Sequence, residues 1–175
     1  MAGSQITFQQ YQSPSLHEAG HALIARVLGR KLKELSILND EFGSGSVCRE
    51  VIDAPGQSAM EEIAIALAGE EAPYLWNSSW VTPCEHDRRR IEDITQKYFR
   101  AHDADQLSEA VRPCVQSALS QLREVLAVLA EKLSSLGKLS GDDAEAIIRD
   151  QSPADVALDH CIAEALAKLL APESK

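Results

Sequence analysis

Two histidines and a glutamate near the start of the chain have the spacing of a metal-binding motif. His17-Glu18-Ala19-Gly20-His21 matches H-E-x-x-H and lies in a stretch that favours a helix. Residues i and i+4 of a helix share one face, so both imidazoles could bind one zinc ion. Glu18 projects about 100° further round the helix, where it could act as general base toward a water. The motif therefore predicts a zinc site with hydrolytic chemistry.

A competing interpretation is that the two histidines are ordinary core or boundary side chains. Glu18 would then only help to cap the helix from Ser15. The chain has 5 His and 16 Glu, and a random shuffle of this composition contains the motif in roughly one per cent of cases. The low chance frequency and the helical context favour zinc binding.

A catalytic zinc site also needs a third protein ligand and an open position for water. Val27 stands where a metzincin would have its third histidine, so the ligand must come from another element. Asp87 is the best-placed residue, since it falls in the first turn of an expected helix whose apolar face continues through Ile91 and Ile94. The alternative is that Asp87 only interacts with the positive end of that helix.

Length and charge narrow the class of protein. The chain has 175 residues, 45% of them hydrophobic, and a net charge of −10, which predicts one globular domain over residues 1–175. The acidic field disfavours nucleic acid and anionic membranes as partners. The first residues lack the order of a signal peptide, no apolar run is long enough to span a bilayer, and no phosphate-binding GxxxxGK[ST] loop occurs. A cytoplasmic protein is expected.

Four cysteines lie far apart without a C-x-x-C pair, unlike a secreted disulfide framework. They are Cys48, Cys84, Cys114 and Cys161. We interpret them as small buried apolar side chains in a reducing compartment, with Cys84 a possible exception because it lies close to the expected ligand.

The apolar spacing predicts a mainly α protein with one small β region. Apolar residues recur mostly every three or four positions, as on helix faces. A first helix is expected to begin after Ser13, with Pro14 in its first turn, and to end at Gly29. Between Leu32 and Ile52 the pattern alternates around a glycine-containing turn, which predicts a hairpin.

Capping patterns and breaks predict the later helices. Ser58 with Glu61 and Thr82 with Glu85 have S/T-x-x-E spacing, which predicts helix starts near residues 58 and 83, separated by a loop over 73–83. The second half of the chain is expected to contain a break at 102–105 and a kink at Pro113, followed by a long helix over 115–136 that Gly137 ends. A short helix capped by Ser140 and Asp143 is expected next. A last helix is expected to begin at residue 152 and to end before Pro172.

Two further features are interpreted as structural. Arg88-Arg89-Arg90 is expected to form a solvated helix face or to pair with Glu85 and Glu92, not to bind nucleic acid. Trp76 and Trp80 could gate substrate, but packing is at least as good an explanation.

Several segments together resemble the peptidase domain of FtsH-type ATP-dependent zinc metalloproteases. They are His17-Glu18-Ala19-Gly20-His21-Ala22, the following strand and turn, Ala66-Leu67-Ala68-Gly69-Glu70-Glu71-Ala72, Asp87 at a helix start, and the later stretch from Leu119 through Asp143. The similarity covers residues 14–150, and 152–175 is a C-terminal helical extension. It implies a zincin-like helical domain with one Zn²⁺ per chain, held by His17, His21 and Asp87, and with Glu18 as the catalytic base.

The chain also departs from this family. Ala72-Pro73 replaces an Ala-Glu pair, and Cys84-Glu85-His86 replaces the usual approach to the ligand, so His86 or Glu85 is an alternative third ligand. The chain encodes neither the membrane anchor nor the ATPase to which such domains are fused. The resemblance therefore implies an ATP-independent peptidase acting on unfolded or flexible polypeptides, with a separate ATPase chain as a possible partner. A homo-oligomer is a further possible partner, because the expected helix over Leu119–Leu133 has an apolar stripe that could serve an interface or its own core.

Two alternatives remain open from the sequence. One is a catalytically silent zinc-binding module that regulates or binds another protein. The other is a helical interaction protein without a metal.

Overall fold

The computed structural model describes residues 13–38, 45–76, 84–151 and 157–171. Within these ranges the chain forms seven helices and three strands. The fold is mainly helical with a small antiparallel sheet formed largely near the N-terminus, which confirms the predicted fold class.

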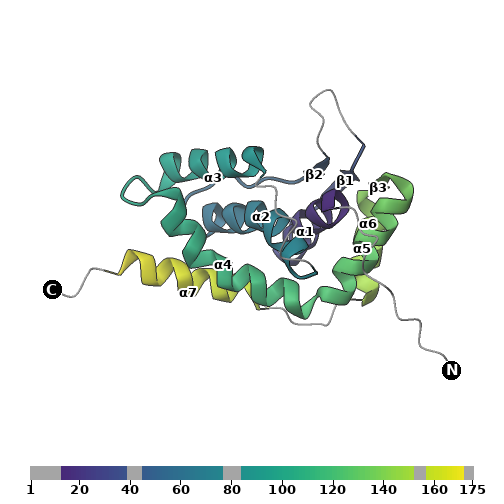
Figure 1. Ribbon diagram of the computed structural model, residues 1–175. Helices are drawn as coiled ribbons and strands as arrows, with labels where there is room; N and C mark the ends of the chain where they lie inside the picture. The colour runs from purple at the N-terminus through teal and green to yellow at the C-terminus, as the bar shows by residue number, and fades with distance from the viewer. Residues whose placement is uncertain (1–12, 39–44, 77–83, 152–156, 172–175) are drawn as a thin grey trace.

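Two helices form the centre of the fold. α1 (Ser13–Val27) packs along α2 (Gln57–Tyr74), and both are enclosed by the other helices (Figure 1). Their contact is close because small side chains meet there: a Cβ placed on Gly20 would lie only 2.6 Å from the Cβ of Ala72 and would also strike the carbonyl of Ala68. Only glycine fits at this position without moving a helix apart.

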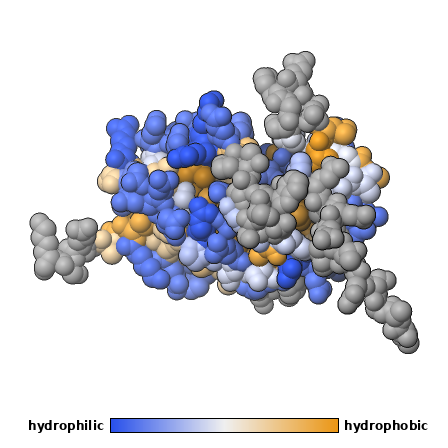
Figure 2. All heavy atoms as spheres, viewed as in Figure 1, coloured by the Kyte–Doolittle hydropathy of each residue, from blue (hydrophilic) through white to orange (hydrophobic). Residues whose placement is uncertain are grey.

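The remaining helices pack around this pair. They are α3 (Glu85–Tyr98), α4 (Ala104–Gln121), α5 (Arg123–Leu136), α6 (Gly141–Gln151) and α7 (Leu158–Leu170). α4 and α7 cover α2 from one side, α5 packs on α1, and α3 runs along α2 on the opposite side from α7 (Figure 1). The outward face of α3 is strongly hydrophilic in Figure 2, and only Ile91 and Thr95 of this helix are buried.

The sheet has three antiparallel strands in the order β2-β1-β3. β1 (Leu32–Ser36) and β2 (Ser46–Arg49) pair with each other, which confirms the predicted hairpin. β3 (Lys138–Ser140) was not predicted, because three residues are too few to show an alternating pattern. It pairs with the other edge of β1 and leaves β2 as an outer strand.

The prediction of one long helix over 115–136 is wrong. The chain departs from helical geometry at Leu122 (φ −100°, ψ 17°), and α4 and α5 meet there. α4 continues through Pro113, whose missing N–H leaves only the carbonyl of exposed Glu109 without its helical donor. Leu122 is fully buried, so the turn between the helices lies against the core. The periodic spacing of apolar residues continues across Leu122, so it does not indicate that the helix ends there.

Helix boundaries were predicted better than the residues that cap them. α2 begins one residue before Ser58, but its N-cap is Gly56 and no side chain caps it, so the predicted capping box is not formed. Glu61 instead accepts from the side chains of Arg30 and Gln57. The N-cap of α3 is Cys84, and Thr82 lies outside the described residues.

Two of the later predictions about helix ends are confirmed, and others fall partly outside the described residues. Ser140 Oγ accepts from the Asp143 N–H at the start of α6, as predicted. Gly137 ends α5 in the left-handed conformation (φ 75°), also as predicted. The predicted opening of the last helix at 152–155 lies outside the described residues, and α7 ends at Leu170, before Pro172. α2 continues to Tyr74, so the loop predicted from residue 73 begins later, and residues 77–83 also lie outside the described residues.

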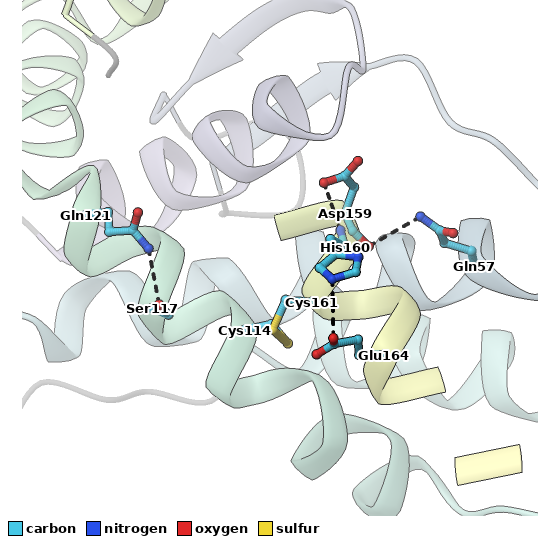
Figure 3. The surroundings of a disulfide bond; sticks show 8 residues. All are labelled: Gln57, Cys114, Ser117, Gln121, Asp159, His160, Cys161 and Glu164. Atoms are coloured by element: carbon cyan, nitrogen blue, oxygen red, sulfur yellow. Dashed lines mark hydrogen bonds and ion pairs between the residues drawn. A yellow bond between two sulfur atoms is a disulfide. The ribbon is translucent and has the colours of Figure 1, made fainter. Parts of the chain in front are cut away.

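The interpretation of the cysteines as small buried apolar side chains, with Cys84 a possible exception, is wrong for the paired Cys114 and Cys161 and for exposed Cys48. Cys114 of α4 and Cys161 of α7 form a disulfide (Figure 3). Beside it, Gln57 of α2 donates a long hydrogen bond (3.5 Å) to the main-chain carbonyl of Asp159. The sequence offered no signal for the pair, because its members are 47 residues apart and only the packing of α7 on α4 brings them together. Of the two free cysteines in the described residues, Cys48 is exposed and Cys84 is half-buried.

Among the described residues, no helix has both the length and the apolar character needed to cross a bilayer.

Replacing one member of the disulfide should destabilise the fold. The bond closes a loop of 47 residues, so we expect Cys161→Ser to lower the free energy of unfolding by about 2–4 kcal/mol in urea titrations. Cys48→Ser is the matched control: its thiol is exposed and free, so a change within about 0.5 kcal/mol is expected. Equal stability of the two variants would contradict a stabilising role for this bond.

Candidate metal centre

The H-E-x-x-H segment lies on α1, with its two imidazoles turned toward α2. His21 is buried, and its Nδ1 lies 2.7 Å from the carbonyl oxygen of Ile65. A carbonyl only accepts hydrogen bonds, so Nδ1 carries the proton and Nε2 of a neutral ring keeps its lone pair. His17 Nε2 lies 3.0 Å from His21 Nε2, with the two rings edge to face. The helix therefore brings both Nε2 atoms to one point.

Asp87 completes this group from α3. Its Oδ2 lies 3.1 Å from Nε2 of His17 and 3.2 Å from Nε2 of His21. His86 and Glu85, the alternatives that the sequence left open, are exposed and do not belong to the group. Within the described residues, these three side chains are the only set of His, Cys, Asp or Glu ligand atoms close enough together to hold one metal ion.

The geometry of the three atoms fits a zinc ion. Zinc bonds to nitrogen and oxygen are about 2.0–2.1 Å long, so neighbouring ligand atoms of a tetrahedral site lie about 3.3 Å apart. The three separations here are 3.0, 3.1 and 3.2 Å. Asp87 Oδ2 is buried and has no well-directed hydrogen bond, although both imidazoles lie next to it. Two imidazoles and one carboxylate form a donor set that zinc accepts, with the fourth position left open.

The electrostatics of the group indicate strong mutual attraction. Burial lowers the pKa of His17, but contacts with Asp87 and Cys84 and the charge of Glu18 outweigh this effect and raise it to about 10. Burial raises the pKa of Asp87, but the adjoining imidazoles of His17 and His21 hold it well below its usual range. A positive charge is thus strongly favoured among these side chains, and either a proton or a metal ion supplies one.

Glu18 lies beside the three converging atoms but is not one of them. Only 6% of the residue is exposed, and this burial raises the pKa of its carboxyl, with the charges of His21 and His17 opposing the rise. A Cβ placed on Gly45 would lie 2.7 Å from Oε1 of Glu18. The carboxylate is therefore held against the residue that precedes β2, and its raised pKa makes it a stronger base than an ordinary carboxylate.

Gly69 of α2 is a site residue to which sequence reasoning assigned no role. A Cβ there would strike the imidazole of His21 and would lie 2.7 Å from Cε1 of His17. The signal was present, because a glycine inside a helix costs about 1 kcal/mol relative to alanine and usually has a packing reason. The sequence could not show which side chains need the space.

The basic run and the tryptophan have structural partners. Arg89 pairs with Glu85 and Arg88 with Glu92 along exposed α3, as the sequence predicted. Arg90 instead reaches buried Glu62, which the sequence did not predict. Trp76 is half-buried with the guanidinium of Arg123 over its ring, consistent with packing, and Trp80 lies outside the described residues.

No protein-family model matches this chain, and no curated protein matches it. The resemblance to FtsH-type peptidases therefore rests on the motif and the quoted segments alone, and it stays a prediction.

Zinc affinity should depend steeply on pH. In protein stripped of metal, His17 with a pKa of about 10 keeps its proton throughout the neutral range, and zinc must displace that proton. Acid therefore weakens zinc binding, and each pH unit gained between about 6.5 and 8.5 should raise the affinity about tenfold. Competition against a chromophoric chelator, corrected for its own protonation, measures this slope. An affinity that levels off above about pH 7 would mean an ordinary imidazole pKa and would contradict the expectation.

Gly69→Ala should weaken zinc binding while leaving the helices formed. The added methyl group displaces the His21 and His17 rings, and disturbing groups that orient metal ligands typically costs about 10–100-fold in affinity. Glu70→Ala is the control, since it changes the neighbouring position on α2 without adding an atom near the imidazoles. Unchanged zinc affinity in Gly69→Ala would show that the ligand rings are not confined as described.

Proposed function

We propose that this chain is a zinc-dependent endopeptidase of the H-E-x-x-H type that hydrolyses peptide bonds in unfolded or flexible polypeptides. The observation that carries the proposal is the convergence of His17, His21 and Asp87 from two helices far apart in the chain. The buried carboxylate of Glu18, the residue next to His17, supports the proposal as its candidate general base. One zinc per chain is the proposed cofactor.

In the proposed reaction, His17, His21 and Asp87 would hold the zinc ion, which would supply Lewis-acid activation of water and of the scissile peptide carbonyl. Glu18 takes the proton of the attacking water and then delivers it to the leaving amine. The Ile65 carbonyl fixes the orientation of the His21 ring through Nδ1. Asp87 balances positive charge with its carboxylate, and the apolar surroundings of α1 and α2 keep bulk water away from the reacting groups.

The outer strand β2 supports polypeptide as the substrate class. β2 pairs only with β1 among the described strands, and it begins next to Glu18 through Gly45. An extended peptide could add to this edge by main-chain hydrogen bonds and so pass the proposed catalytic base. Such pairing is largely indifferent to side chains, which suits cleavage of unfolded chains without strict sequence preference.

The similarity to FtsH-type peptidases extends this proposal to partners. A peptidase acting without its own ATPase would cleave substrates that are already unfolded, and a separate ATPase chain or a homo-oligomer would extend its range. A cytoplasmic location also stays a prediction. The cysteines no longer support this location, because Cys114 and Cys161 form a disulfide. A reducing cytosol disfavours such a bond.

A catalytically silent zinc module would use the same three ligands. In that case Glu18 would have no function, yet burying a carboxylate carries a desolvation cost that selection would remove from a purely structural site. The raised pKa of Glu18 beside the ligand group therefore favours catalysis over the silent alternative.

Glu18→Gln should keep zinc and lose proteolysis. Glutamine has the same shape but cannot accept the proton, so cleavage of unfolded casein should fall at least about 100-fold while zinc stoichiometry stays at one. Glu124→Gln, an exposed change on α5, is the control with expected wild-type activity.

Four results of this experiment are informative. Chelator treatment should abolish wild-type cleavage, and added zinc should restore it. Full activity of Glu18→Gln would remove this residue from the reaction. A wild-type protein that binds zinc but cleaves nothing would favour the silent module, and one that binds no zinc would contradict the proposal.

A further inference from the structure

A second buried charge cluster lies close to the proposed metal ligands and is centred on Glu62 of α2. The Glu62 side chain is 4% exposed, and both of its oxygens are bonded to arginines. Arg49 holds it with two hydrogen bonds, Nη2 to Oε2 at 2.7 Å and Nη1 to Oε1 at 3.1 Å. Arg90 Nη2 donates to Oε2 at 2.5 Å. The bidentate geometry fixes the carboxylate in one orientation.

Each arginine of this cluster comes from a segment adjoining one part of the proposed site. Arg30, whose Nε lies 3.5 Å from Glu62 Oε1, follows the end of α1, the helix that carries the H-E-x-x-H segment. Arg49 ends β2, the strand that starts beside Glu18. Arg90 lies on α3, the helix that carries Asp87. One buried carboxylate therefore ties together the two helices that carry the ligands and the strand that starts beside Glu18.

The bond to Arg90 matters most because it links α3 to α2 one turn after Asp87, next to the apolar contacts of Ile91 and of half-buried Ile94. Only Ile91 and Thr95 of α3 are buried, and the ion pairs of Arg88 and Arg89 stay within the helix. The far end of α3 is tied at the surface, where Asp53 accepts from Lys97 and Tyr98. Arg90 is three residues after Asp87 and lies on the same face of α3. The ion pair of Arg90 with Glu62 therefore restrains the helical turn that carries Asp87.

We propose that Glu62 is a positioning residue for the metal centre, which acts through Arg90 to set the distance between Asp87 and the two histidines. The proposal rests on the proposed function, because it assumes that these three side chains bind a metal. It goes beyond that function in assigning a role to two residues that touch neither the metal site nor a substrate. Partners that orient metal ligands are typically worth about 10–100-fold in affinity.

The test compares metal binding in Arg90→Met with binding in wild type. Methionine keeps the length of the side chain and removes its charge and donors. We expect zinc affinity to fall about tenfold or more. The visible absorption of the Co²⁺-substituted protein should also change in position or intensity, because the Asp87 carboxylate no longer lies at its original distance. Arg90→Lys, which restores the charge, should recover part of the affinity.

Two controls separate positioning from simple stabilisation. Arg89→Met removes an exposed arginine from the same helix, and its zinc affinity should stay within about twofold of wild type. Arg112→Met breaks the ion pair with buried Glu71 that ties α2 to α4, a helix without a ligand residue. It should lower the melting temperature without changing the Co²⁺ spectrum.

A double-mutant cycle tests whether Arg90 acts through Asp87. In an Asp87→Ala background, Arg90→Met should cause no further loss of metal affinity, because the ligand that it positions is gone. Equal losses in both backgrounds, or a wild-type spectrum and affinity in Arg90→Met, would overturn the positioning role. Arg90→Gln provides the same comparison should Arg90→Met melt below the assay temperature.

The outcome also distinguishes this inference from the proposed function. A wild-type protein that binds neither Zn²⁺ nor Co²⁺ contradicts both. A wild-type protein that binds them, together with an Arg90→Met variant that binds them equally well, overturns only the role of Glu62 and Arg90.

Discussion

The structure depends on one electrostatic constraint: two imidazoles of α1 and a carboxylate of α3 meet beside α2. Their ligand atoms lie 3.0–3.2 Å apart, and this closeness is stable only if a positive charge lies among them. When no metal is bound, a proton on His17 supplies this charge, which is why the pKa of His17 is raised and the pKa of Asp87 is lowered. A divalent cation would satisfy the same requirement with more charge, which is why we propose that the group binds a metal.

The packing around the group explains why small residues occur where they do. Gly20 lets α1 approach α2, and Gly69 leaves room for the imidazoles at the point of closest approach. The Ile65 carbonyl then meets Nδ1 of His21, so α2 supplies both the space and the acceptor. α3 is different, since it presents Asp87 from a polar helix that is held by charged contacts rather than by a large apolar face. The rigid half of the site is therefore built by close packing, and the other half by ion pairs.

Elements with a strong local pattern were predictable, and those formed by distant partners were not. The first helix and the hairpin follow from periodicity and glycine placement, and the structure confirms both. β3 is too short to have a period, and its strand character comes from pairing with β1. The break at Leu122 is set by core packing, and the Cys114–Cys161 bond by the docking of α7 on α4. Arg90 illustrates the same limit within one tripeptide: Arg88 and Arg89 pair locally as predicted, whereas Arg90 reaches a buried partner 28 residues earlier.

By itself, the sequence determined the helical character of the protein and the pairing of His17 with His21, because a four-residue spacing on a helix places two side chains together whatever the rest of the chain does. It also marked Glu18 as distinct from the ligands, since helical geometry points it elsewhere. Only the tertiary structure decided that Asp87, rather than His86 or Glu85, lies at the histidines, because that choice depends on the rotation of α3 about its axis. That rotation is set by contacts between helices distant in the chain, above all those of Ile91 and Arg90. Local sequence patterns do not predict such contacts.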